Sequence, residues 1–186
     1  ERKLQGFIYA SYLGCLLANR LAEGRCVMRW RSFISLAVLV LVLDQGTKAA
    51  ALALLDYHVP VSVFPGFNLT LGFNTGASFG MLYNIMADKP MVMAALTSAL
   101  TVFLACMGLR ARLPLERAGF ALIVGGACGN ILDRLRHGAV TDFLDFYWRD
   151  WSWPTFNGAD VAIFLGAAAI LTAGMKRLPK TGASVG

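Results

Sequence analysis

Four long apolar stretches constrain what this chain can fold into more than any other feature of its sequence. They run over Phe33–Leu55, with the polar island Asp44–Lys48 inside it, and then over Pro90–Leu109, Ala118–Leu132 and Val161–Met175. A helix that crosses a bilayer needs roughly 20 mostly apolar residues, with about 17 as the lower limit. The third and fourth stretches hold only 15 uncharged residues each, so they reach that length when Asp133 and Asp160 lie at or just inside the boundary. We therefore expect an all-α integral membrane protein with four transmembrane helices.

The charged residues agree with four membrane crossings. Only 15% of the 186 residues are charged, whereas soluble domains carry about 25%. Nine lysines and arginines flank the stretches on one side, namely Arg25, Arg29, Arg31, Arg110, Arg112, Arg117, Lys176, Arg177 and Lys180, against four in the segments 56–89 and 133–160. Since basic residues concentrate on the cytoplasmic side, we expect both termini in the cytoplasm and those two segments outside. These anchors account for the net charge of +6, and no motif indicates nucleic-acid binding.

The two ends of the chain are expected to lie outside the folded domain. Met28 is followed by Arg-Trp-Arg and the first apolar stretch, a typical start for a bacterial multi-pass protein. We therefore interpret residues 1–27 as a non-native or upstream extension, with an amphipathic helix on the membrane surface as the alternative. Residues 28–180 are then the four-span membrane domain, and residues 181–186 are a flexible tail.

Metal chemistry and serine chemistry are both disfavoured. The four cysteines show no CxxC spacing, and His58 and His137 are too few for a zinc site. The sequence contains no HExxH. Residues 76–80 (GASFG) fit the letters of GxSxG, but neither histidine has an obvious nucleophile partner that would make Ser78 a catalytic serine. We expect no metal and no cofactor, which leaves the carboxylates as the candidates for chemistry.

Three aspartates are predicted to meet at the outer membrane face. Asp133 ends the third stretch and Asp160 opens the fourth, so antiparallel helices place both at the same face, and the short segment between them carries Asp142 back there. Ionisable side chains at a bilayer are costly and are functional candidates by default. Each also has a structural alternative: Asp133 can place the adjacent Arg134, Asp160 can stabilise a helix N-terminus, and Asp142 can be a surface-loop residue.

Two further polar pairs lie in or beside the spans. Asp44 and Lys48 are four residues apart, on one helical face, and can simply neutralise each other. Asn130 lies inside the third span and needs a partner there, for which Asn157 at the start of the fourth is the candidate.

Two local patterns add detail to the expected fold. Phe67–Leu71 alternates apolar and polar residues, which predicts a short strand and makes the outer segment 56–89 a small β-structured shelf. Gly125 and Gly129 form a Gly-xxx-Gly pair, a spacing suited to close packing between membrane helices.

Five short motifs occur in order along the chain. They are DQGTK at 44–48, NTGASF at 74–79, GNILDR at 129–134, GAVTDF at 138–143 and FNGAD at 156–160. Together with the hydropathy pattern, over about residues 28–178, they resemble bacterial lipoprotein signal peptidase, or signal peptidase II, a family of four-span aspartic peptidases. Ser78 stands where alanine is more usual in that family and Thr141 where valine is, and neither change removes a functional group.

The resemblance implies a role for each motif. It makes Asp142 and Asp160 the catalytic pair. The resemblance also implies that six residues bind substrate or brace the site. They are Asn74, Gly76, Asn130, Asp133, Arg134 and Asn157. Asp44 and Lys48 are implied to be structural or positioning residues.

The resemblance also implies a reaction and a substrate. Two close carboxylates share a proton and titrate as a unit. One takes a proton from the attacking water, while the other hydrogen-bonds the scissile carbonyl oxygen. The implied partners are membrane lipid and a prolipoprotein that is cut just before a diacylglyceryl-modified cysteine, at the periplasmic face of the bacterial inner membrane. The oligomeric state stays open, and a monomer is compatible with the sequence.

A proton-coupled small membrane transporter is the main alternative. Paired carboxylates near a lysine or arginine also describe transporters, and the interruption at Asp44–Lys48 supports such a function. No internal repeat is evident, and the aspartates gather at one face rather than at the midplane, which favours the peptidase. A purely structural membrane scaffold would leave the placement of the aspartates and asparagines unexplained.

Overall fold

Four membrane-length helices and a small sheet make up the described part of the chain. The computed structural model describes residues 30–76 and 89–176. Within these ranges the helices are Trp30–Leu54, α3 (Pro90–Arg110), α4 (Pro114–His137) and α5 (Gly158–Met175). The strands are β1 (Val61–Phe64), β2 (Phe67–Asn74), β3 (Val140–Trp148) and β4 (Trp151–Ser152). The expected four-span architecture is confirmed, whereas the predictions for residues 1–27 and 181–186 lie outside the described residues.

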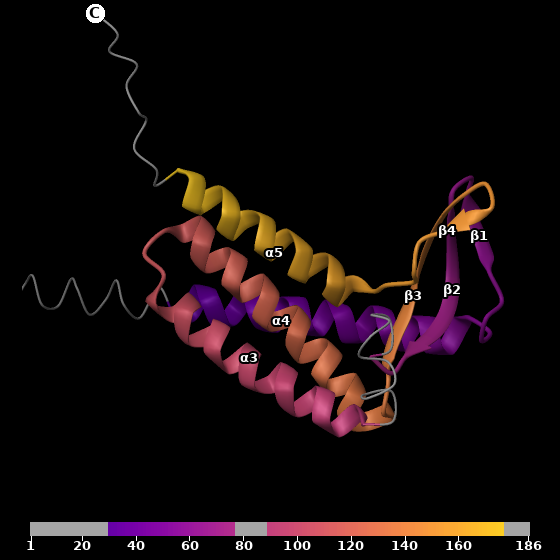
Figure 1. Ribbon diagram of the computed structural model, residues 1–186, viewed down its shortest axis with the longest axis horizontal. Coiled ribbons are helices and arrows are strands. Elements are labelled where there is room, and N and C mark those ends of the chain that lie inside the picture. Colours follow the sequence, from indigo (N-terminus) through magenta and orange to yellow (C-terminus); the bar gives the residue numbers. More distant parts are fainter. Residues whose placement is uncertain (1–29, 77–88, 177–186) are drawn as a thin grey trace, which may run out of the picture.

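Helix α4 is the central helix of the bundle, with the first helix behind it and α3 and α5 on either side (Figure 1). Glycines let its backbone approach its neighbours. A Cβ atom on Gly125 would lie 2.6 Å from the carbonyl oxygen of Ala37, and one on Gly126 would lie 2.5 Å from that of Ala159. The predicted close packing at Gly125 and Gly129 is confirmed, since Gly129 leaves room only for the carboxylate of Asp44.

The polar residues at the span boundaries are part of the helices. α4 has 24 residues because it includes Asp133 and continues to His137, where Gly138 ends it with a φ of 72°. α5 includes Asp160 in its first turn. The first helix runs without a break from Trp30 to Leu54, through the polar island Asp44–Lys48. That continuity removes the helix break that best supported the transporter alternative.

The sheet joins the two segments that were expected to lie outside the membrane. Its strand order is β1-β2-β3-β4, with antiparallel pairing throughout. The predicted strand Phe67–Leu71 is confirmed as part of β2. Strand β3 was not predicted, although its run of β-branched and aromatic residues is typical of strands. In Figure 1 the sheet stands at one end of the helices, so the pairing of β2 with β3 brings Asp142 to that end.

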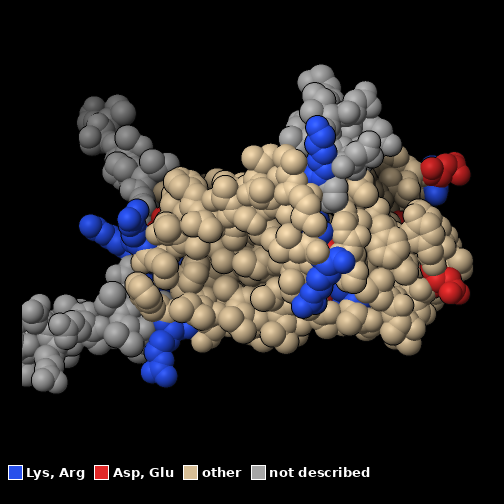
Figure 2. All heavy atoms as spheres, turned by 90° about the horizontal axis from the view of Figure 1, so that it is seen from below, with Lys and Arg blue, Asp and Glu red and all other residues tan. Residues whose placement is uncertain are grey.

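The outer surface of the helices is apolar. Side chains such as Leu43, Phe103 and Phe164 are exposed by 59%, 59% and 73%. Soluble proteins rarely expose contiguous patches of this kind. Figure 2 shows basic side chains at the helix ends farthest from the sheet, a broad uncharged middle, and charged side chains again toward the sheet. This distribution is that of a membrane-crossing bundle.

We expect Gly126→Ala to lower the free energy of unfolding by about 1–3 kcal/mol, the usual cost of overpacking a well-packed core. The added methyl group would collide with the α5 backbone at Ala159. Gly174→Ala is the matched control, because nothing lies within 4 Å of a Cβ atom there. Chemical unfolding of both variants in detergent checks this, and equal stabilities would contradict the packing described for α4.

Candidate active site

The start of α5 fixes two of the predicted site residues against each other. Asn157 is the N-cap, and its Oδ1 accepts a hydrogen bond of 3.0 Å from the backbone N–H of Asp160. The Oδ2 of Asp160 in turn accepts a bond of 3.2 Å from the backbone N–H of Asn157. This reciprocal capping satisfies two N–H groups that a helix start leaves without partners. It leaves the Asn157 amide nitrogen and the second Asp160 oxygen available for other contacts.

Two asparagines connect Asp142 with Asp160. The Nδ2 of Asn157 donates to Asp142 Oδ1 at 2.7 Å and to Asn130 Oδ1 at 3.2 Å. The Nδ2 of Asn130 donates to Asp160 Oδ1 at 2.9 Å. The predicted pairing of Asn130 with Asn157 is therefore present, and it forms the bridge between two carboxylates from β3 and α5.

Lys48 determines which way the Asn130 amide points. Its ammonium group lies 2.8 Å from Asn130 Oδ1, 2.9 Å from Asp44 Oδ2 and 3.1 Å from Asp133 Oδ2. Lysine can only donate hydrogen bonds, so Asn130 turns its oxygen to Lys48 and its NH₂ group to Asp160. Lys48 is only 2% exposed, and the pair formed with Asp44 is thus one part of a larger buried cluster.

The carboxylates of this cluster also hold the backbone of the site. Asp44 Oδ1 accepts from the N–H of Ala159 in the first turn of α5, at 3.0 Å. Asp133 Oδ2 accepts from the N–H of Thr141 on β3, at 2.9 Å. Asp133 Oδ1 accepts from Gln45 Nε2 at 3.0 Å, a contact of the first polar island that the sequence analysis did not assign. The residues that precede Asp142 and Asp160 are therefore both tied to the Lys48 cluster.

Asp142 is a buried strand residue, not the surface-loop residue of the structural alternative. It is 2% exposed. Its burial and the neighbouring charge of Asp160 raise the pKa of the Asp142 carboxyl to about 6, against the opposing effect of hydrogen bonds from Asn157 and Asn74 and of the charge of Lys48. Asp142 therefore keeps its proton to a higher pH than an ordinary aspartate, as expected for one member of a carboxylate pair.

The remaining predicted residues flank this pair. Asn74 hydrogen-bonds Asp142 and also accepts a bond of 2.8 Å from the N–H of Gly76, whose φ is 96°. Arg134 donates from Nη1 to the Asn130 carbonyl at 3.3 Å, and its charge acts on both Asp142 and Asp160. The Nε of Arg134 is buried and has no hydrogen-bond partner among the described residues.

The two aspartates face different cavities. Asp160 lines one of about 260 Å³ together with the mainly apolar side chains of Trp153, Phe156, Val161 and Phe164. Asp142 lines a more polar cavity of about 240 Å³. Its other lining residues are His58, Gly72, Phe73, Asn74, Thr75, Pro154 and Thr155. The sequence analysis considered His58 only as a possible zinc ligand, since no motif connects it to Asp142. Within residues 30–76 and 89–176, no three histidine, cysteine, aspartate or glutamate residues are grouped as metal ligands.

Fold and site together define a multi-span membrane protein with two linked carboxylates where its helices meet the sheet. Residues 36–176 match the family model described as signal peptidase (SPase) II. The chain is 42% identical over 149 residues to proteins named lipoprotein signal peptidase from Yersinia pestis and Yersinia pseudotuberculosis, which covers 79% of this chain and 86% of theirs. The chain therefore belongs to the signal peptidase II family, whose members are aspartic peptidases.

Solved structures agree with this assignment. Two structures described as bacterial membrane enzymes superpose with TM-scores of 0.70 and 0.69, at 26% and 27% identity. They cover 82% and 79% of this chain, and 92% and 94% of their own. The fold is thus shared over nearly the whole length of those enzymes.

We expect Lys48→Met to lower the free energy of unfolding by about 3–5 kcal/mol, because removing one partner leaves the other charges of a buried ion pair uncompensated. Lys89→Met, at an exposed position, is the matched control and should change stability by no more than about 0.5 kcal/mol. Unfolding of both variants in detergent provides the measurement. Equal stability of the two variants would show that the Lys48 cluster does not hold the site together.

Proposed function

We propose that this protein removes signal peptides from prolipoproteins, with Asp142 and Asp160 as the catalytic pair. The observation that carries the proposal is the bridge of Asn157 and Asn130, which joins these two carboxylates where the membrane helices meet the sheet. The names of the relatives, lipoprotein signal peptidase, support the substrate class.

The different environments of the two aspartates suggest different roles. Asp142, with its pKa raised to about 6, carries the shared proton and donates a hydrogen bond to the scissile carbonyl oxygen. Asp160, half-buried and open to its cavity, is the base. It takes a proton from water as the water oxygen bonds to the carbonyl carbon. That proton then passes to the leaving amide nitrogen as the C–N bond breaks, which regenerates the pair without a covalent intermediate.

The two cavities suggest how the substrate lies. The mainly apolar cavity beside Asp160 is formed partly by a membrane helix and suits the signal-peptide side of the cleavage point. The polar cavity beside Asp142 is formed by the sheet and suits the residues that follow. Arg134, with one buried guanidinium N–H unpaired within the described residues, and Asn74 are placed to bind peptide carbonyl groups. The diacylglyceryl-cysteine lies between them, at the membrane boundary.

The proposed orientation follows from the charges at the two ends of the bundle. Arg31, Arg110, Arg112 and Arg117 lie at the ends of the helices away from the sheet. The positive-inside rule makes that end cytoplasmic. Both termini of the domain 28–180 then lie in the cytoplasm, and the site faces the periplasm of a bacterial inner membrane.

We expect Asp142→Asn and Asp160→Asn each to lower turnover by at least about a thousandfold, since removal of a central catalytic group costs roughly that factor or more. Purified protein and a prolipoprotein carrying diacylglyceryl-cysteine are incubated, and cleavage is followed as a gel shift, with an unlipidated substrate alongside. Asp145→Asn is the matched control. It lies on the same strand, its carboxylate accepts only a bond from Thr70 among the hydrogen bonds seen there, and it should keep parental activity. Normal turnover by Asp142→Asn would refute the assignment of the pair.

The Asp142→Asn substitution should raise the free energy of unfolding at high pH. The Asp142 pKa is about 6 in the folded protein against 3.8 ordinarily, so the neutral form favours folding, and that contribution is lost as pH rises through about 6. Asp142→Asn cannot ionise and should exceed the parent at pH 8 by about 1–3 kcal/mol, since a tenfold change in an ionisation constant is worth about 1.4 kcal/mol. The difference should shrink toward zero near pH 4. Unfolding curves at both pH values test this, and a variant less stable than the parent at pH 8 would contradict it.

A further inference from the structure

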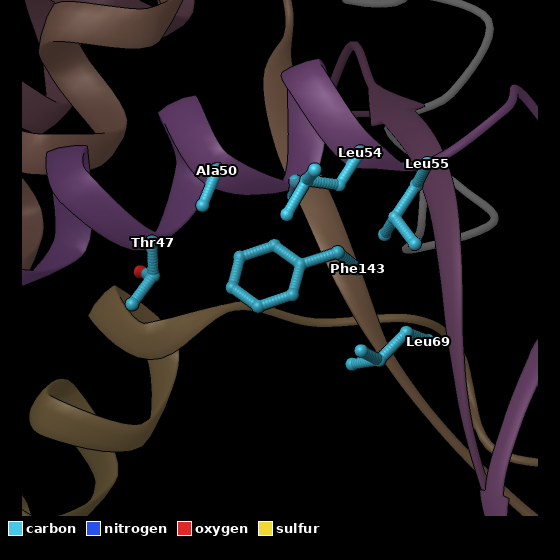
Figure 3. A pocket seen from close by; sticks show the side chains of 7 residues that line it. Thr47, Ala50, Leu54, Leu55, Leu69 and Phe143 are labelled. Carbon is cyan, nitrogen blue, oxygen red and sulfur yellow. The ribbon is translucent and has the colours of Figure 1, made fainter.

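An apolar cavity lies on the opposite side of strand β3 from Asp142. It measures about 230 Å³ and forms where the outer end of the first helix meets the sheet. Figure 3 shows the side chains around it. They are Thr47, Ala50, Ala51, Leu54 and Leu55 from the helix, Leu69 from β2 and Phe143 from β3. Since successive strand residues point to opposite faces, Phe143 faces this cavity while Asp142 faces the hydrogen-bonded network.

The cavity offers an occupant at most one hydrogen-bonding atom, the Thr47 hydroxyl oxygen as an acceptor. Thr47 is its one lining residue with a polar side chain, and the Thr47 hydroxyl donates to carbonyl groups of its own helix, to Leu43 at 3.0 Å and to Asp44 at 2.9 Å. Water in such a site would lack the polar partners it needs. A peptide segment would bury unpaired backbone groups there, which costs free energy. The cavity therefore suits a hydrocarbon.

The opening of the cavity continues the surface that contacts the bilayer. Ala50 and Leu54 are exposed on the membrane-crossing helix, Leu54 by 81%. A spanning helix is covered on its outer side by lipid. Bilayer lipid is therefore the hydrocarbon that has direct access to this cavity, whereas in the proposed reaction a lipid attached to the substrate starts from the Asp142 side of the strand.

We propose that this cavity binds one acyl chain of a bilayer phospholipid and that the bound chain stabilises the strand that carries Asp142. A chain in the cavity would contact Leu69 and Phe143, on the two strands whose pairing positions Asp142. The backbone N–H groups of Phe143 and Leu144 donate to the carbonyl of Phe156 at 3.0 and 2.8 Å. Packing against Phe143 thus supports both β3 and the segment that leads into α5. The site is independent of the proposed reaction, because occupancy requires no catalysis.

The test uses the full chain in nanodiscs that contain a phosphatidylethanolamine with a photoactivatable diazirine on one acyl chain. After irradiation, the labelled positions are identified by peptide mass spectrometry. Labels are expected on the helix segment 47–55 and at Leu69 and Phe143. Ala50→Phe fills part of the cavity, so the acyl chain would bury about two fewer methylene groups there. Labelling should therefore fall about tenfold, which is the loss of affinity that corresponds to that loss of burial. Ala49→Phe, on an exposed neighbouring position outside the cavity, should leave the labelling unchanged.

Leu54→Gln provides a second variant that disturbs little packing, because Leu54 is mostly exposed at the opening. It should also lower the labelling of Leu69 and Phe143. Added phospholipid should raise the thermal midpoint of the parent and of Ala49→Phe in detergent, but not that of Ala50→Phe. Labels spread evenly along the lipid-facing helices and insensitive to Ala50→Phe would overturn the proposal. So would labelling of Phe143 only by a diazirine on the acyl chain of a lipidated substrate, which would assign the cavity to the substrate instead.

Discussion

A single buried ammonium group holds the outer end of this protein together. Lys48 lies between Asp44, Asp133 and Asn130, and is almost inaccessible. Through the two carboxylates it reaches the first turn of α5 and the start of β3, since Asp44 accepts from Ala159 and Asp133 from Thr141. A buried cation is costly unless it is paired and fully hydrogen-bonded. Loss of any one partner would therefore leave a buried charge without compensation, and the positions of β3 and α5 depend on the complete cluster.

Close helix packing is what allows such a cluster to form. The first helix can bring Asp44 and Lys48 against α4 only because α4 presents Gly125 and Gly129 to it. Helix α4 also presents Gly126 to α5, at the turn that contains Ala159. Small residues therefore set the backbone separation, and the separation sets which polar groups come within hydrogen-bonding distance. The packing of the apolar helices and the hydrogen bonds of the polar site therefore both depend on these glycines.

Much of this arrangement is predictable from the sequence, and the rest depends on tertiary contacts. Length and hydropathy predict the four spans, because a bilayer imposes a minimum length on every crossing. The pairing of Asn130 with Asn157 is also predictable, because a polar side chain inside a span needs a partner. Strand β3 was missed although Val140–Trp148 is rich in strand-forming residues, because its pairing partner β2 lies more than 60 residues earlier in the chain. The contacts of Gln45 and His58 could not be predicted, since neither belongs to a spacing pattern that specifies its neighbours.

The balance of charge around the site supports the shared proton that we propose for Asp142 and Asp160. Within the described part of the network, Asp44, Asp133, Asp142 and Asp160 face the cations Lys48 and Arg134. Four ionised carboxylates against two cations would leave two negative charges in a largely buried network. One bound proton halves that excess. A proton is best held where the carboxyl group is buried and another carboxylate is near, and Asp142 meets both conditions. Asp160 is half-buried, and it accepts one hydrogen bond within its own helix start and one from Asn130. The asymmetry that we propose between a proton donor and a base thus arises from where two helices and a strand place their ends.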